Sequence, residues 1–167
     1  MPRQEHEAHY LDSMHAVFAA LNRVLGKHRW GVTGRIEETD PLPKVGCRYA
    51  RTRKSVLRRG RVLEVIRPVS LTLYETLYDP PCRVRLQLRW RVHSARDESL
   101  LHLVLSYQLN GAATLRGRHW DGRLREHCER MLRFVAVELE RSRRAARACS
   151  TSRDSRGNVI CLTSDPP

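Results

Sequence analysis

The sequence lacks the features that would identify a disulfide-stabilised, secreted or membrane-spanning protein. Its cysteines, at positions 47, 82, 128, 149 and 161, include no pair with CxxC spacing, and their odd number argues against a disulfide framework. The longest apolar run, residues 16–21, is far too short to cross a bilayer, and the N-terminus shows no signal-peptide pattern. We therefore expect a soluble, cytoplasmic protein.

Motifs for metal, nucleotide and nucleophilic chemistry are also missing. The segment His6-Glu7-Ala8-His9 is not HExxH, and His119 and His127 have no third ligand at a convincing spacing. The chain contains no P-loop, no GxGxxG and no visible Ser/His/Asp set. These absences predict no metal and no cofactor, and they leave catalytic residues unassigned.

Lysine is scarce, yet the chain is strongly basic. It carries 31 lysines and arginines against 18 acidic residues, a net charge of +13, and only three of the basic residues are lysine. Residues 141–167 hold six arginines and two acidic residues, so most of the excess charge lies elsewhere. Such a surface predicts non-specific attraction to nucleic acid and anionic lipid. We expect one domain over residues 1–145 and a basic, disordered tail over 146–167.

Two helices are predicted from apolar residues that recur every three or four positions. The longer runs from Trp120 to about Leu139 and lines one face with Trp120, Leu124, Cys128, Met131, Val135 and Leu139. It is expected to fray through 141–147. The shorter helix follows a cap at Asp12 or Ser13 and stops near Gly26.

Alternating apolar and polar residues predict strands over the rest of the chain. We expect them near 6–11, 30–38, 45–56, 61–67, 71–78, 83–93 and 100–109, with a turn at Gly60. The clearest is 83–93, where apolar residues alternate with Arg83, Arg85, Gln87, Arg89, Arg91 and His93. Short connections favour antiparallel pairing, and the long helix is the natural cover for the apolar face of the sheet.

This pattern resembles the SRPBCC superfamily, also called START-like or Bet v 1-like, in particular its polyketide cyclase/dehydrase and lipid-transport branch. The residues that carry the resemblance are Val17-Phe18, Trp30, the "vG..y"-like segment 44–49, the "G.v.e..p...l"-like segment from Gly60 to Leu71, and the terminal helix. Asp97–Leu101 stands where the family usually has a Gly-Thr, and the second small helix of the family is not evident.

The resemblance implies an α+β helix-grip fold. In this fold a curved antiparallel sheet, here of about seven strands, wraps around a long C-terminal helix, and one shorter helix lies near the N-terminus. It also implies a hydrophobic cavity between sheet and helix that binds, and in some members transports, a lipid-like or polycyclic apolar molecule. The family has no universal catalytic motif, so catalysis is not implied.

Glu75 is the most informative residue because the alternation of its strand places it on the same side of the sheet as the apolar residues Leu71, Leu73 and Leu77. A turn at 79–82 pairs Tyr78 with Arg83 and places Glu75 opposite Leu86. If Val92 pairs with Leu101, Leu86 lies opposite Tyr107, and Glu75 and Tyr107 are about 10 Å apart in one row.

A buried carboxylate is costly unless it is paired or protonated, so Glu75 is a candidate polar ligand contact or general acid. The alternatives are an ion pair with an arginine or a place near the rim of the sheet. A slip of one residue in the last hairpin would turn Tyr107 outward and His102 inward.

The predicted ligand-binding residues all lie on the inner face of the sheet or on the apolar stripe of the long helix. They are Glu75, Leu86, Leu88, Trp90, Leu105, Tyr107, Trp120, Leu124 and Met131. Trp90 and Trp120 are expected to meet across the interface, with plain core packing as the alternative for each. Tyr49 is a weaker candidate of the same kind. An aromatase/cyclase enzyme is the alternative function, and it would use Glu75 and Tyr107.

The opposite face of the sheet favours another partner class. Arg83, Arg85, Arg89 and Arg91 lie beside Tyr74 and Tyr78 on the neighbouring strand, an arrangement typical of single-stranded nucleic-acid binding. The alternative is a solvated face on which arginines stack on tyrosines. The sequence has no RNP-like motif.

Overall fold

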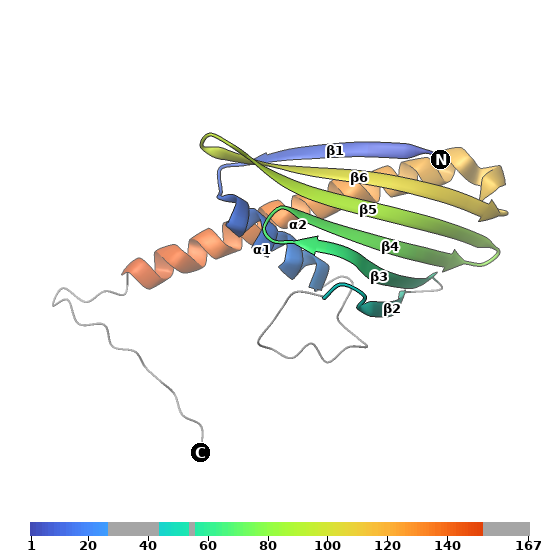
Figure 1. Ribbon diagram of the computed structural model, residues 1–167, viewed down its shortest axis with the longest axis horizontal. Helices are drawn as coiled ribbons and strands as arrows, with labels where there is room; N and C mark the ends of the chain where they lie inside the picture. Colours follow the sequence, from blue (N-terminus) through green and yellow to red (C-terminus); the bar gives the residue numbers. More distant parts are fainter. Residues whose placement is uncertain (27–43, 54–55, 152–167) are drawn as a thin grey trace, which may run out of the picture.

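The protein forms an antiparallel sheet with two helices on one face (Figure 1). This computed structural model describes residues 1–26, 44–53 and 56–151. In order, the elements are β1 (Arg3–Tyr10), α1 (Met14–Leu25), β2 (Arg48–Arg53), β3 (Val56–Ile66), β4 (Ser70–Asp79), β5 (Cys82–Ala95), β6 (Glu98–Gly111), a 3-10 turn (Thr114–Arg116) and α2 (Gly117–Thr151). The six described strands follow the order β1-β6-β5-β4-β3-β2. This is the predicted helix-grip fold.

Both helices cover the same side of the sheet, which we call the inner face (Figure 1). The apolar stripe of α2 predicted from the sequence is buried, from Trp120 at 3% exposure to Leu139 at 1%. The alternating side chains of β5 divide as expected: Val84, Leu86, Leu88, Trp90 and Val92 are buried. None of the helices within the described ranges is both long and apolar enough to cross a membrane.

The α2 helix is longer than predicted. It begins at Gly117, continues to Thr151 and extends past the end of the sheet (Figure 1). The expected fraying through 141–147 is wrong, because Arg141, Arg143 and Arg144 pair with Glu138 and Glu140 one turn earlier. Residues 146–151 of the predicted tail are helical, and 152–167 lie outside the described residues.

The predicted turn at Gly60 is also wrong. Gly60 lies in the middle of β3, between Tyr49 on β2 and Glu75 on β4. Glycine is needed there because a Cβ atom would overlap the ring of Tyr49. The missing side chain therefore makes room for a neighbouring strand's ring instead of reversing the chain. The predicted strand over 30–38 lies outside the described residues.

The register of the later strands is confirmed. Tyr78 pairs with Arg83, Val92 with Leu101, and Leu86 with Tyr107. His102 therefore points to the outer face, where its Nε2 lies 3.4 Å from a carboxylate oxygen of Glu5.

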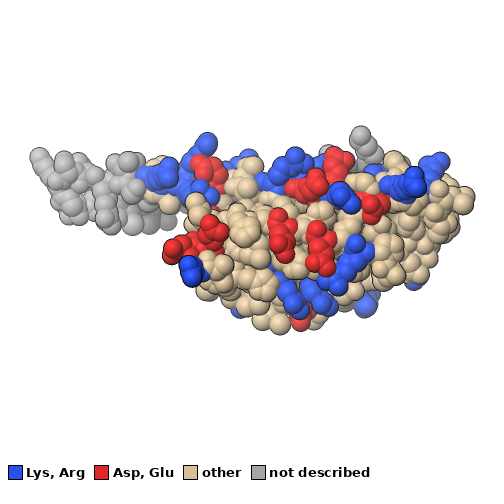
Figure 2. Space-filling model, turned by 90° about the horizontal axis from the view of Figure 1, so that it is seen from above, with Lys and Arg blue, Asp and Glu red and all other residues tan. Residues whose placement is uncertain are grey.

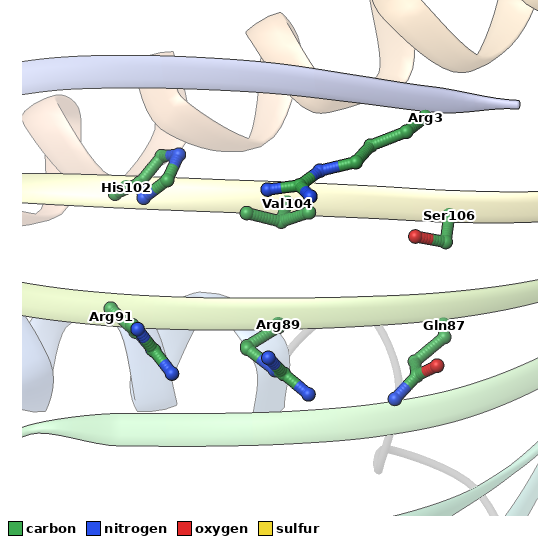
Figure 3. Close-up of a pocket in the computed structure, with 7 residues that line it drawn as sticks. All are labelled: Arg3, Gln87, Arg89, Arg91, His102, Val104 and Ser106. Carbon is green, nitrogen blue, oxygen red and sulfur yellow. The ribbon is translucent and has the colours of Figure 1, made fainter.

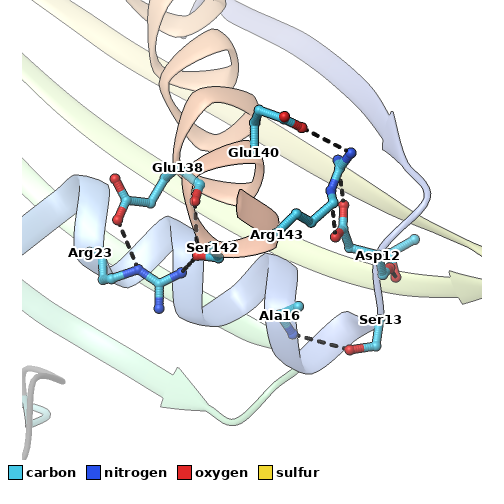
Figure 4. Close-up of polar contacts among 9 residues, drawn as sticks. Asp12, Ser13, Ala16, Arg23, Glu138, Glu140, Ser142 and Arg143 are labelled. Carbon is cyan, nitrogen blue, oxygen red and sulfur yellow. Dashed lines mark hydrogen bonds and ion pairs between the residues drawn. The ribbon is translucent and has the colours of Figure 1, made fainter. Parts of the chain in front are cut away.

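Polar contacts join α1 to the C-terminal half of α2 (Figure 4). Arg23 donates to Glu138 at 3.0 Å and to Ser142 at 2.8 Å. Arg143 reaches back to Asp12, just before α1, at 3.0 Å. Of the two predicted caps of α1, Ser13 is the one observed, and its hydroxyl accepts from the backbone N–H of Ala16. These contacts fix how α1 lies against α2.

Candidate functional site

Five strands contribute one residue each to a row across the inner face. Successive strand pairings place Tyr49, Gly60, Glu75, Leu86 and Tyr107 side by side, from β2 to β6. The row contains a carboxylate and two phenol groups on a face that is otherwise mostly apolar. It is the candidate functional site.

Glu75 lies at the centre of the row and is completely buried, at 0% exposure. Its Oε1 accepts a 2.5 Å hydrogen bond from the hydroxyl of Tyr49, and its Oε2 lies 3.5 Å from Nη1 of Arg58. Burying a lone carboxylate would cost several kcal/mol, so the phenol and the guanidinium are what make this position tolerable. The predicted alternative of an ion pair with arginine is thus confirmed. A contact between Glu75 and a ligand stays a prediction.

The local sequence of β2 and β3 explains why these two groups reach Glu75. Gly60 leaves the space through which the Tyr49 ring crosses β3 toward β4. Arg58 lies two residues before Gly60 on the same strand and so faces the same side of the sheet. Its side chain is 21% exposed, so the guanidinium stands between the interior and solvent.

At the other end of the row, Tyr107 is bound to α2. Its hydroxyl donates a 2.7 Å hydrogen bond to Oδ1 of Asp121, which also accepts from the Gln4 amide of β1. Burial and this hydrogen bond raise the pKa of Tyr107 to about 12. Hydrogen bonds from Tyr107 and Gln4 lower the pKa of Asp121. Tyr107 therefore stays a neutral donor and Asp121 a carboxylate over the physiological pH range.

Two buried indoles add unused donors to the interior. Within the described residues, neither Nε1 of Trp90 nor Nε1 of Trp120 has a hydrogen-bond partner, and both atoms are buried. Trp120 packs beneath the guanidinium of Arg123, which lies 4.7 Å from its ring centroid. Trp90 is four residues along β5 from Leu86, about 13 Å away. The expected contact between the two indoles stays a prediction.

The remaining predicted residues are part of the core. Leu88 and Leu105 face each other across β5 and β6, next to the row. Leu124 and Met131 lie on the buried stripe of α2. Each of the four is at most 3% exposed, which fits packing and ligand contact equally well.

The sequence reasoning missed how Tyr49 and Arg58 meet Glu75. An acidic residue such as Glu75, on the side of a strand that is otherwise apolar, indicates that a polar partner faces it. The sequence does not identify these partners, because a glycine such as Gly60 also suits a turn, and a turn there would take Arg58 out of the strand next to Glu75.

Metal-binding geometry is not found in the part of the chain that the structure describes. There, no group of three or more histidine, cysteine, aspartate or glutamate side chains could hold an ion.

Comparison with known proteins identifies the fold. Neither a protein-family model nor a curated protein matches the sequence. Solved structures do match. A conserved protein from Geobacillus kaustophilus is 12% identical with a TM-score of 0.65, over 84% of this chain and 97% of that one. Protein MLL2253 from Mesorhizobium loti is 16% identical with a TM-score of 0.64, over 84% and 98%.

A third structure comes with a biological context. DynU16 is described as a putative protein in the dynemicin biosynthetic locus; it is 13% identical with a TM-score of 0.57, over 83% of this chain and 47% of that chain. At these identities the matches show the fold alone.

Proposed function

We propose that this protein binds an apolar small molecule with polar substituents between the inner face of its sheet and α2. The observation that carries the proposal is Glu75, a fully buried carboxylate in the middle of an apolar face. Plain packing would be served as well by apolar residues in place of both Glu75 and Arg58, because replacing a whole buried ion pair with apolar residues is often neutral or stabilising. A carboxylate held by Tyr49 and Arg58 instead provides a fixed acceptor for a donor group of a ligand.

The buried indoles support a ligand with acceptor groups as well. A buried donor without a partner costs about 1–3 kcal/mol. A carbonyl or ether oxygen of a bound molecule would satisfy Nε1 of Trp90 or Trp120. The ligand class that meets both requirements is a polycyclic or lipid-like molecule that carries a hydroxyl and a carbonyl.

The order of elements and the fold are also what the SRPBCC superfamily has, and we propose membership of its polyketide cyclase/dehydrase and lipid-transport branch. An aromatase/cyclase reaction is the alternative. It would use the polar groups of Glu75 and Tyr107, with the carboxyl group of Glu75 acting as a base when ionised or as an acid when protonated.

The first experiment is native mass spectrometry of the protein purified gently from the organism that encodes it. We expect an extra mass of a few hundred daltons that organic solvent releases. The Glu75→Gln variant keeps the shape of the side chain and removes its charge, and should lose most of this mass. Glu64→Gln is the matched control, because Glu64 lies on the outer face and bonds to Thr72 at 3.0 Å.

Nile red, a neutral polycyclic dye with a carbonyl group, provides a second readout. We expect it to bind the emptied protein and to bind Trp90→Phe several-fold more weakly. If the protein carries no small molecule and Glu75→Gln lowers stability without changing dye binding, then Glu75 is only a structural ion-pair partner and the proposal is wrong. Chemical conversion of the released molecule by wild type, but not by Glu75→Gln, would favour the cyclase alternative.

A further inference from the structure

The outer face of the sheet carries a stripe of arginine along β5. Every second residue of a strand points to the same side, about 6.6 Å apart. On β5 the outward residues are Arg83, Arg85, Gln87, Arg89 and Arg91. Both described helices lie on the other side of the sheet, so this stripe faces solvent (Figure 1).

At one end of the stripe, arginine side chains stack on tyrosine rings. The guanidinium groups of Arg59 and Arg83 lie 5.9 and 5.2 Å from the ring centroid of Tyr78. Arg61 lies 5.8 Å from that of Tyr74. This half of the outer face therefore has the predicted alternative arrangement, a solvated surface on which arginines stack on tyrosines. These tyrosine rings already contact arginines and are not free to stack on nucleic-acid bases.

The other end of the stripe forms a hollow of about 170 Å³ (Figure 3). Its lining residues are Arg3, Gln87, Arg89, Arg91, His102, Val104 and Ser106. Arg3 reaches over β6 from β1, and Arg89 and Arg91 stand next to each other on β5 (Figure 3).

Some of the basic side chains in this hollow have acidic partners and others do not. Arg3 pairs with Glu5 at 2.6 Å, and His102 lies 3.4 Å from Glu5. Within the described ranges, Arg89 and Arg91 have no ion-pair partner. Two adjacent guanidinium groups without a carboxylate repel each other, and an anion placed between them would remove that repulsion.

Acidic side chains on both sides of the arginine stripe limit the shape of an anion that could bind there. Glu5 and Glu7 lie on β1 at one side of the stripe, and Glu64 lies on β3 at the other. Figure 2, seen from the β1 side, shows acidic side chains interspersed with basic ones there. A broad anionic surface such as a bilayer would meet these carboxylates, whereas a narrow chain of charges along β5 would not.

We propose that single-stranded nucleic acid binds along β5, with its phosphate groups held by Arg89 and Arg91 and its polar base edges near Gln87 and Ser106. Arginine is suited to phosphate because its planar fork donates two parallel hydrogen bonds. Because Tyr74 and Tyr78 are stacked by arginines, binding depends on phosphate contacts rather than on base stacking, so it has little sequence preference and strong salt dependence. This site is separate from the inner face and does not rest on the proposed small-molecule function.

Fluorescence anisotropy with a labelled oligo(dT) of about 20 nucleotides tests the proposal. Each phosphate contact on a single strand contributes about 0.7 to the slope of log K against log salt. The double variant Arg89→Gln/Arg91→Gln should therefore bind at least tenfold more weakly at low salt, with a slope smaller by about 1.4. The matched control is Arg118→Gln/Arg133→Gln, which makes the same change of charge on exposed arginines of α2.

The control distinguishes binding at a specific site on β5 from non-specific attraction to the positive charge of the protein. If both double variants weaken binding equally, or if Arg89→Gln/Arg91→Gln leaves the slope unchanged, the proposal is overturned. It is also overturned if the variant loses binding to vesicles of phosphatidylserine and phosphatidylcholine but not to oligo(dT), since the partner would then be a membrane surface. Thermal unfolding of both variants should match wild type, because none of the four arginines is buried.

Discussion

The hydroxyl of Tyr107 donates a 2.7 Å hydrogen bond to Asp121 and so joins the end of β6 to the start of α2. Gln4 of β1 donates to the same carboxylate. One side chain of α2 thus holds the two strands at this edge of the sheet. Hydrogen bonds to charged groups contribute about 1.5–3 kcal/mol, and partial exposure of Asp121 reduces this.

Tyr107→Phe and Asp121→Asn should each lower the free energy of unfolding by about 1 kcal/mol at neutral pH. Urea denaturation measures the change. The two effects should not add, because Tyr107→Phe removes the hydrogen bond to Asp121 and Asp121→Asn weakens that same bond by removing the charge of its acceptor. Full additivity would contradict the coupling.

The contribution of Asp121 should depend on pH. Its pKa in the folded state is lowered from the ordinary value of 3.8, so the stabilisation is fully present above that value and is lost as the pH falls through the folded pKa. The difference in stability between wild type and Asp121→Asn should therefore narrow in acid. Tyr107 behaves oppositely, because its pKa is raised to about 12 from 10.0 and its contribution is lost as the pH rises through this interval.

Gly60→Ala should destabilise the protein by about 1–3 kcal/mol, because the new Cβ overlaps the ring of Tyr49. The matched test is the same change in a Tyr49→Ala background, where the ring is absent. We expect Gly60→Ala to cost much less there, and a double-mutant cycle of unfolding free energies measures the coupling. An equal cost in both backgrounds would show that Gly60 is required for another reason.

Glu138→Gln should loosen the contact between α1 and α2. The side chain of Glu138 is 11% exposed and accepts from Arg23, which also bonds to Ser142. We expect a loss of about 1 kcal/mol that shrinks as salt is added. Glu126→Gln is the control, since Glu126 pairs with Arg130 on the exposed side of α2 and its loss should cost only a few tenths of a kcal/mol.

Tyr10→Phe should cost about 1 kcal/mol, because the hydroxyl of Tyr10 donates a buried 2.9 Å hydrogen bond to the carbonyl of Leu132. The phenol is a second donor to that carbonyl, which lies near the middle of α2. Thermal unfolding of the variant measures the loss. An unchanged midpoint would mean that solvent satisfies the carbonyl equally well.

The sequence was sufficient for the architecture and for much of the register. The alternation in 83–93 and the turn at 79–82 place Glu75 opposite Leu86, and the last hairpin places Leu86 opposite Tyr107. These pairings are local, because each strand is followed at once by its neighbour. Strong period-two patterning on one buried face leaves little freedom for slippage.

What sequence could not provide is the set of partners of Glu75 and Asp121. Tyr49 is 26 residues from Glu75, and Gln4 is 117 residues from Asp121. Such contacts depend on how strands are placed at the edges of the sheet, and no periodicity encodes that. Gly60 shows the same problem, because glycine suits both a turn and a position over which a ring must pass.

The place of β1 has a consequence for how the chain folds. β2 to β6 pair with neighbours in sequence, whereas β1 pairs with residues 99–106, which lie 89 to 103 positions further along the chain. During synthesis β1 and α1 leave the ribosome before β6 and α2, and they must wait for these elements before they can dock. Until then, the edge of β6 that β1 will cover is open to pairing with other chains. Refolding at high protein concentration should therefore lose yield to aggregation at this late docking step.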